Sequence, residues 1–172
     1  SPLFAQQGVT QCGTSTGQPK FPIETYEELP DPTPPSDKEW AAVTTTQVSW
    51  GTTDVRYAKH KLPQLKKQQI AVLKGWRGER VNAQAVVWTG AEVKDLNFSF
   101  TDFKDKKGNS LSNEAFKGGF IRYVMTDELN KDGRGACGHR KAVDFDSLLV
   151  ADPIDTNLKS LALPSRTVQP IW

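Results

Sequence analysis

The stretch Trp76-Arg-Gly-Glu-Arg-Val-Asn-Ala-Gln-Ala-Val-Val-Trp88 decides the fold class of this chain. From Glu79 to Thr89 apolar and polar residues alternate, with charged residues at the entrance, and this period is typical of a β-strand. A second segment of this kind, Thr167–Trp172, ends in Gln169-Pro-Ile-Trp172 and predicts the start of another strand. The sequence therefore predicts a β-rich domain, and we expect it to belong to a larger protein.

Short alternating segments broken by turn residues follow one another from residue 45 onward. In Val93–Thr101, for example, Leu96, Phe98 and Phe100 share one face of a strand. Phe103–Ser110 has the Gly and Asn content of a hairpin loop. The pattern predicts an all-β domain over residues 45–172, an antiparallel β-sandwich that is jelly-roll-like. The predicted strands are Thr46–Trp50, Val55–Tyr57, Gln69–Lys74, Glu79–Thr89, Val93–Thr101, Gly119–Thr126, Ser147–Ala151 and Thr167–Trp172.

We expect residues 1–44 to form an extended, Pro-rich N-terminal arm packed on the domain, and the chain to contain one or two short helices. The arm has too few apolar residues to build a core, so we expect its few large ones to dock it on the domain. Ser36-Asp-Lys-Glu39 fits a capping box and predicts a helix through Trp40 and Ala42. Leu62–Leu73 fits either a helical face or a loop that leads into a strand; Pro63 favours the loop.

Charge and hydropathy exclude several classes of function. The chain has 22 Lys and Arg against 20 Asp and Glu, a net charge of +2, and the basic residues are spread along it. Neither a nucleic acid nor an anionic membrane surface is indicated as a partner. No run approaches the roughly 20 apolar residues of a membrane-spanning segment. The first residues lack a signal peptide's basic and apolar regions, so we expect any such peptide to have been removed.

The sequence carries no convincing catalytic or metal-binding set. Cys12 and Cys137 either form one disulfide or remain two thiols, and His139 beside Cys137 completes no four-ligand zinc site. Phosphate-binding and nucleophile-elbow motifs are absent, so we predict no cofactor and no metal. Asp127-Glu128 is the kind of carboxylate pair that cleaves glycosides, but the residues that follow are turn formers, which favours an ordinary polar loop.

Tryptophans are the remaining candidates for binding. Trp50, Trp76 and Trp172 lie in or beside predicted strands, where aromatic rings are most often buried in a core or an interface. Trp76 is the best candidate for an exposed ring that stacks on a sugar. The charged residues that follow it either bind polar groups or form an ion pair that fixes the strand end. These residues are Arg77, Glu79 and Arg80.

Taken in order, several blocks resemble the N-terminal β-sandwich domain of Bacteroidetes-type proteins related to family 123 glycoside hydrolases, which include β-N-acetylgalactosaminidases. The resemblance spans roughly residues 45–172. The blocks are Ser49-Trp-Gly-Thr-Thr-Asp-Val-Arg-Tyr-Ala-Lys59, Trp76-Arg-Gly-Glu-Arg-Val-Asn-Ala-Gln-Ala85, Arg122-Tyr-Val-Met-Thr-Asp-Glu128, Cys137-Gly-His139, Val150-Ala-Asp152 with Ile154-Asp155, and Gln169-Pro-Ile-Trp172.

The resemblance implies a partner domain and a place of action. In that family the sandwich precedes a (β/α)₈ barrel, which holds an Asp-Glu pair that works with the substrate's own acetamido group. We therefore expect a noncatalytic accessory domain of an exported, periplasmic or cell-surface glycoside hydrolase, which packs on a catalytic barrel. A sandwich that lacks its last strands would expose a strand edge. The alternative is a self-standing carbohydrate-binding module that uses an exposed Trp platform.

Overall fold

The computed structural model describes residues 28, 30, 31, 33–126 and 148–172. These residues form mostly antiparallel strands with very little helix, which confirms the predicted all-β class. The elements are α1 (Asp37–Trp40), β1 (Gln47–Gly51), β2 (Gln84–Thr89), β3 (Val93–Asn97), β4 (Phe103–Lys104), β5 (Ser110–Leu111), the 3₁₀ helix η2 (Asn113–Ala115), β6 (Phe120–Thr126), β7 (Leu148–Asp155), β8 (Ser160–Leu163) and β9 (Thr167–Ile171).

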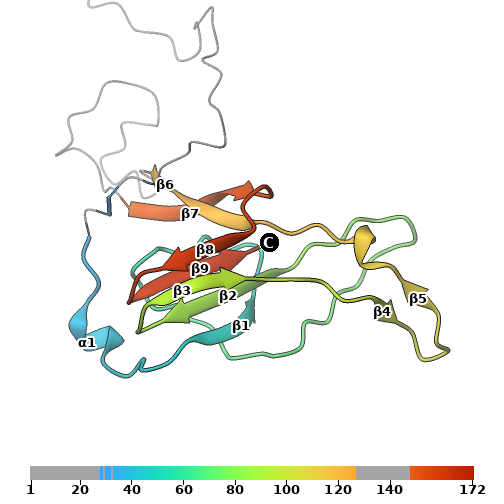
Figure 1. Ribbon diagram of the computed structural model, residues 1–172, viewed down its shortest axis with the longest axis horizontal. Helices are drawn as coiled ribbons and strands as arrows, with labels where there is room; N and C mark the ends of the chain where they lie inside the picture. Colours follow the sequence, from blue (N-terminus) through green and yellow to red (C-terminus); the bar gives the residue numbers. More distant parts are fainter. Residues whose placement is uncertain (1–27, 29, 32, 127–147) are drawn as a thin grey trace, which may run out of the picture.

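The main sheet has five strands in the order β1-β2-β9-β6-β7 (Figure 1). β9, which was predicted as Thr167–Trp172, is an interior strand rather than an exposed edge. It pairs with β2 from Ala85↔Ile171 to Thr89↔Thr167, and with β6 at Phe120↔Ile171. The strand near the end of the described chain is therefore held on both sides.

The core on one face of the sheet follows from the alternation in β2. Val86 and Trp88 point to this face and pack with Val168 of β9, and Trp40 and Tyr57 cover them. Ser36 caps α1, because its side-chain oxygen accepts a hydrogen bond from the Glu39 amide. The helix is a single turn that serves to bury Trp40, whose indole N–H donates to the His60 carbonyl at 2.8 Å.

The opposite face is covered by a second layer, the two-stranded sheet β3-β8. In Figure 1 this pair lies across β2 and β9, and the Phe98 ring contacts the Phe120 ring of β6 edge to face at 5.2 Å. Leu163 of β8 is fully buried. No strand was predicted at Ser160–Leu163, because four residues beside turn formers give too short a pattern to stand out.

Three predicted strand segments are wrong. Val55–Tyr57 is irregular, and only the next residue, Ala58, forms a bridge, to Val150. Gln69–Lys74 and the first part of Glu79–Thr89 are also irregular, since β2 begins at Gln84. Alternation is a local pattern, whereas a strand also needs a neighbour that pairs with its amides and carbonyls along its length, and none of these segments forms a continuous ladder with another described strand.

Residues 57–59 nevertheless tie the sheet together. The Ala151 amide donates to the Tyr57 carbonyl at 3.1 Å, the Lys59 amide donates to Leu149, and the Val168 amide donates to the Lys59 carbonyl at 2.8 Å. This short segment therefore bridges β7 and β9. At the other side of the sheet, the Trp50 amide of β1 donates to the Gln68 carbonyl at 2.9 Å.

The predicted hairpin at Phe103–Ser110 is confirmed, with β4 and β5 paired through Phe103↔Leu111. Its turn is closed by Asp105, whose carboxylate accepts from the Lys107 and Asn109 amides at 2.8 Å each. Hydrogen bonds from Asn109, its side chain first, lower the pKa of Asp105. The hairpin extends beyond the main sheet, at the end of the molecule opposite α1 (Figure 1).

Candidate functional site

A cleft of about 610 Å³ opens beside the end of β1. β1 ends at Gly51, where a larger residue does not fit because its Cβ would lie 2.4 Å from the Tyr57 hydroxyl oxygen. The chain then turns away and returns along β1 at Gln68, so that it encloses the concavity. We name this concavity the Trp50 cleft. Its lining includes Trp50, Arg56, Lys61, Gln64, Lys66 and Gln68.

The Trp50 ring is held in a defined position in this cleft. Its indole N–H donates to the Gln69 carbonyl at 3.1 Å, and the backbone amide of the same residue is bound by Gln68. The side chain is half-buried. The sequence had placed Trp50 among the binding candidates without a reason to prefer it, and the structure supplies one by setting the ring in a concavity.

Trp76 lies elsewhere, on a turn of the irregular segment 69–83. The Glu79 amide donates to the Trp76 carbonyl at 2.9 Å, and the Glu79 carboxylate accepts from the Trp76 amide at 2.6 Å. Gly78 takes φ of +84°, which the turn requires and which glycine adopts without strain. The Trp76 side chain is 86% exposed, so it belongs to neither core.

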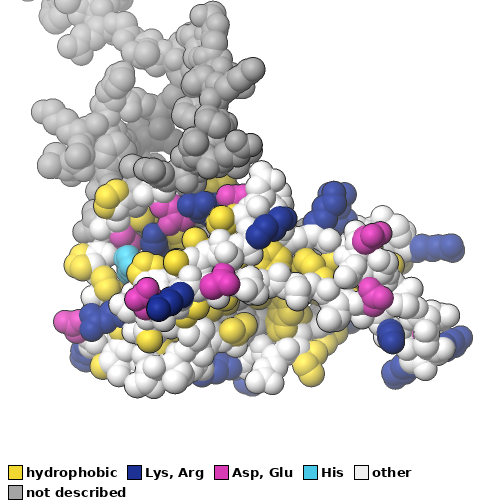
Figure 2. All heavy atoms as spheres, in the orientation of Figure 1, with side chains coloured by type: hydrophobic (Ala, Val, Ile, Leu, Met, Phe, Trp, Pro, Cys, Tyr) yellow, Lys and Arg dark blue, Asp and Glu magenta, His cyan; other side chains and the backbone are white. Residues whose placement is uncertain are grey.

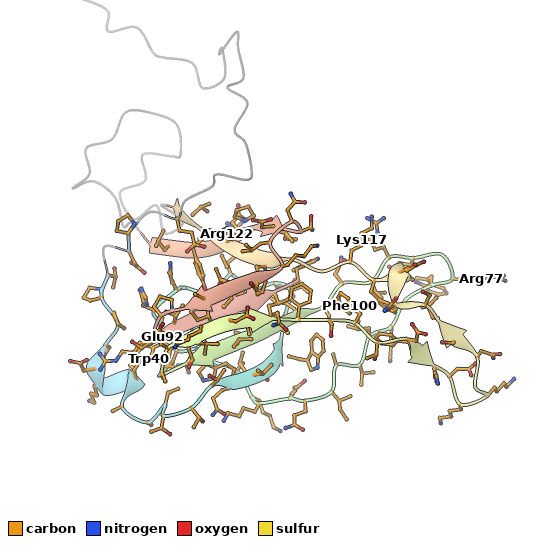
Figure 3. The ribbon with its side chains drawn as sticks, in the orientation of Figure 1. Trp40, Arg77, Glu92, Phe100, Lys117 and Arg122 are labelled. Atoms are coloured by element: carbon orange, nitrogen blue, oxygen red, sulfur yellow. The ribbon has the colours of Figure 1, made fainter. Side chains whose placement is uncertain are left out.

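The charged neighbours of Trp76 form no ion pair with one another in the described part of the chain. Glu79 binds the backbone of the turn, and Arg77 and Arg80 are exposed without a carboxylate within 4.0 Å among the described residues. Figure 3 shows Arg77 at the projecting end of the molecule, beyond Lys117 and Phe100. The proposed strand-end ion pair is therefore replaced by a side-chain-capped turn.

Trp172 is held against the core by its backbone and its ring. Its amide donates to the Gly119 carbonyl at 2.9 Å, and its carbonyl accepts from the Gly119 amide at 3.0 Å. The ring packs against the second core cluster, which contains Ile121, Tyr123 and Leu149. The three tryptophans singled out from the sequence thus lie in three settings: Trp50 in a cleft, Trp76 on an exposed turn and Trp172 against the core.

A second cleft, of about 500 Å³, lies between the residues that follow β3, those that precede β6 and the β7-β8 loop. Phe98, Phe100 and Phe116 line it, together with the aliphatic and ammonium groups of Lys117 and Lys159. The Phe100 and Phe116 rings stack at 5.7 Å, and Phe116 stacks in turn on Phe103 at 4.2 Å. The rings therefore bury part of their surface against one another, and the cluster stabilises the base of the hairpin.

A cluster of charges that the sequence did not reveal joins the arm to the sheet. Glu28 accepts hydrogen bonds from Lys59 Nζ at 2.6 Å, Arg122 Nε at 2.9 Å and the Tyr123 amide at 3.2 Å. Arg122 also lies 3.4 Å from Asp155. The only signal in the sequence is Arg122 itself, a charged residue between the apolar Ile121 and Tyr123 of a strand.

The cations around Glu28 favour the ionised form of its carboxylate. Burial acts to raise the pKa of Glu28, but the hydrogen bonds from Lys59 and Arg122 and the charge of Lys59 outweigh burial and lower the pKa. Figure 3 shows Arg122 on the side of the molecule where β6 and β7 lie. In this cluster each carboxylate faces a cation, and neither of the two clefts described above adjoins it. We therefore interpret the cluster as a structural clasp, a set of ion pairs that holds two segments of the chain together.

Several candidates from the sequence lie outside the described residues: Cys12, Cys137, His139 and the Asp127-Glu128 loop. Among the residues that the structure describes, no group of three or more His, Cys, Asp or Glu side chains gathers in a way that suits a metal ion. Within the same residues, no helix has both the length and the apolar character that crossing a bilayer demands.

Comparison with known proteins agrees with this mostly antiparallel β architecture. Residues 50–172 match the family described as the glycoside hydrolase 123 N-terminal domain, so the chain belongs to that family. No curated protein sequence gives a significant match.

Among solved structures, the chain is similar to a family 123 glycoside hydrolase from Clostridium perfringens, studied for the details of glycolipid glycan hydrolysis. The TM-score is 0.59 at 22% sequence identity, and the alignment covers 75% of this chain and 21% of the other. That likeness shows a shared fold. The chain therefore matches about a fifth of the length of that hydrolase.

Proposed function

We propose that this chain is a noncatalytic accessory domain of an exported glycoside hydrolase, and that it packs against a catalytic domain of the same protein. Membership of an N-terminal domain family and the small share of the hydrolase that the chain matches support a role that needs a further domain. The resemblance to family 123 proteins makes a (β/α)₈ barrel the expected partner. Export follows from the same resemblance.

The observation that carries the proposal is a set of apolar side chains exposed on segment 69–83 and on the β4-β5 hairpin. Ile70 is 77% exposed, Val72 81% and Phe103 54%, on segment 69–83 and on the β4-β5 hairpin. Both segments extend beyond the sheet on the side away from α1 (Figure 1), and Figure 2 shows Lys and Arg side chains among them. Apolar groups so exposed, rimmed by charges, are typical of interaction surfaces.

The docking test compares one substitution in two settings, the 172-residue chain and the complete enzyme that contains it. Val72→Asp should leave the thermal unfolding of the chain unchanged, because Val72 contacts solvent there. In the complete enzyme it should separate the unfolding of the two domains. Val48→Asp, on β1 at 59% exposure, is the matched control. Equal behaviour of the two variants in the complete enzyme would refute docking through segment 69–83.

Absence of catalysis has its own test. The chain should release no p-nitrophenol from p-nitrophenyl β-N-acetylgalactosaminide, whereas the complete enzyme is expected to do so. Turnover by the chain that persists through repurification would overturn the noncatalytic role.

A carbohydrate-binding module is the second candidate, and the exposure of Trp76 favours it. The ring stands on a turn that the Glu79 side chain closes by a hydrogen bond and that Gly78 allows by its positive φ, so it is available for stacking on the apolar face of a sugar. Affinity electrophoresis in gels that contain host or plant glycans would test it. Retardation that is lost in Trp76→Ala supports a module of this kind; equal mobility of the two proteins excludes Trp76 as its platform.

A further inference from the structure

We propose that the Trp50 cleft binds an acidic oligosaccharide, a chain of pyranose units that carry carboxylate or sulfate groups. The cleft combines an aromatic ring fixed in place, side-chain amides and a surplus of cations around one concavity. Neither Trp76 nor Val72 lines it; the docking segment meets it only at Gln69, whose carbonyl binds the Trp50 indole.

Its dimensions and its aromatic ring suit a sugar. A volume of about 610 Å³ lies within the range in which proteins hold small organic ligands, which is on the order of 300–1,000 Å³. Trp50 is half-buried and tethered by the Gln69 carbonyl, so little side-chain entropy is lost when a ligand packs on it. Indole rings in such positions contact the apolar CH face of a pyranose.

The polar lining suits hydroxyl groups. Gln64 and Gln68 line the cleft, and the carboxamide of each offers two donors and an acceptor. The backbone of Gln68 is fixed by hydrogen bonds with Ser49 and Trp50. The Cα of Gln68 is therefore held in place beside β1. A side chain with a fixed backbone can form hydrogen bonds of defined geometry to a ligand.

The positive charge of the cleft favours an acidic ligand. Arg56, Lys61 and Lys66 line the cleft, and its lining residues include no Asp or Glu. Asp152 lies 3.6 Å from Arg56 and offsets that charge. Neither Lys61 nor Lys66 has a carboxylate within 4.0 Å in the part of the chain that the structure describes. A ligand that brings carboxylates or sulfates would be attracted to these ammonium groups.

The choice of a carbohydrate rests on the proposed role in a glycan-degrading protein; the charge and geometry do not depend on it. The two proposals fail separately, since docking is read from domain unfolding in the complete enzyme and cleft binding from titration of the chain alone. An acidic peptide has the same charge, so oligoglutamate enters the test as a competitor class.

The experiment is calorimetric titration of the 172-residue chain with two sugars that share one linkage, cellotetraose and the β-1,4-linked tetrasaccharide of glucuronic acid. The glucuronan should bind measurably more tightly than cellotetraose, and its affinity should fall as NaCl rises from about 0.05 M to about 0.5 M. A chondroitin sulfate tetrasaccharide distinguishes sulfate from carboxylate recognition. Equal affinity for the charged and neutral sugars, no binding of any sugar, or equally tight binding of oligoglutamate would overturn the proposal.

Variants locate the binding. Replacing Lys61 and Lys66 together by Gln should weaken glucuronan binding about fivefold or more while leaving the fold intact, because both side chains contact solvent. The matched control replaces Lys106 and Lys107 by Gln in the β4-β5 turn, with the same loss of charge and no expected change. Trp50→Ala should abolish binding, with far-ultraviolet circular dichroism as the check on folding. An effect of the control as large as that of the cleft pair would show general charge attraction and overturn the site.

Discussion

Replacing Glu28 by Gln tests whether the charged cluster holds the arm on the sheet. The carboxylate accepts from Lys59, Arg122 and the Tyr123 amide, at 2.6, 2.9 and 3.2 Å. A Gln side chain keeps the shape and one acceptor but removes the charge that balances two cations. Charge-assisted hydrogen bonds contribute about 1.5–3 kcal/mol each, and Arg122 retains Asp155 after the change. With a discount for partial solvent exposure, we expect a loss of about 2 kcal/mol in the free energy of unfolding.

Urea titration at about pH 7, followed by tryptophan fluorescence, measures this loss. The control is Asp152→Asn, which removes an ion pair to Arg56 at 3.6 Å between side chains that are 53% and 51% exposed. That pair should contribute less than about 0.5 kcal/mol. If Glu28→Gln changes stability no more than Asp152→Asn does, the cluster is only a surface contact and the reasoning about the clasp is refuted.

The pH dependence of the same variant gives an independent check. Because the folded state lowers the pKa of Glu28, the carboxylate's contribution is fully present above its unfolded pKa of about 4.3 and is lost as pH falls through the lower folded value. The stability difference between the wild type and Glu28→Gln should therefore be constant from about pH 7 to about pH 5 and shrink below about pH 4. A difference that stays constant to the lowest pH at which the protein folds would contradict the assignment.

Further predictions concern the core and one tight contact. Tyr123→Phe leaves the buried Val168 carbonyl without its hydroxyl donor and should cost about 1–3 kcal/mol by urea titration. Gly90→Ala places a Cβ 1.6 Å from the Val43 carbonyl oxygen, so we expect a loss of about 3 kcal/mol or failure to fold, seen as a lower Tm in calorimetry. Trp40→Ala, at a side chain only 3% exposed, should cost about 3–5 kcal/mol, and a loss below about 1 kcal/mol would show that α1 is not part of the core.

Sequence patterns predicted all five strands of the main sheet but could not tell which apolar segments find a pairing partner. Gln84–Thr89 contains the apolar run Ala85-Val-Val-Trp88 and lies between β1 and β9, so the pattern and the pairing agree. Gln69–Lys74 contains a similar run, Ile70-Ala-Val-Leu73, yet it forms no strand, and a local pattern carries no information about that. The short β8 was missed because its sequence pattern is weak, and its pairing with β3 is set by tertiary structure.

For the candidate sites, the sequence indicated which residue types could bind a ligand but not how these residues are arranged in space. The usual burial of aromatic rings holds for Trp40 and Trp88, and Trp76, the best candidate for an exposed ring, is exposed, but nothing in the sequence indicates that Trp50 lines a concavity. Glu28, Lys59 and Arg122 lie far apart along the chain, so their contact depends on the tertiary fold. The cations of the Trp50 cleft become a set only because the chain returns to β1 at Gln68.

The hydrogen bonds that residues 57–59 and 68 make to the main sheet also limit how another molecule can be recognised. Tyr57 and Lys59 occupy backbone groups of β7, and Gln68 occupies the Trp50 amide of β1. Where these bonds are made, an incoming peptide cannot extend the sheet as an added strand. A partner that meets the sheet there must recognise side chains instead. Selectivity would then change through substitutions in the loops, while the strands that set the fold stay as they are.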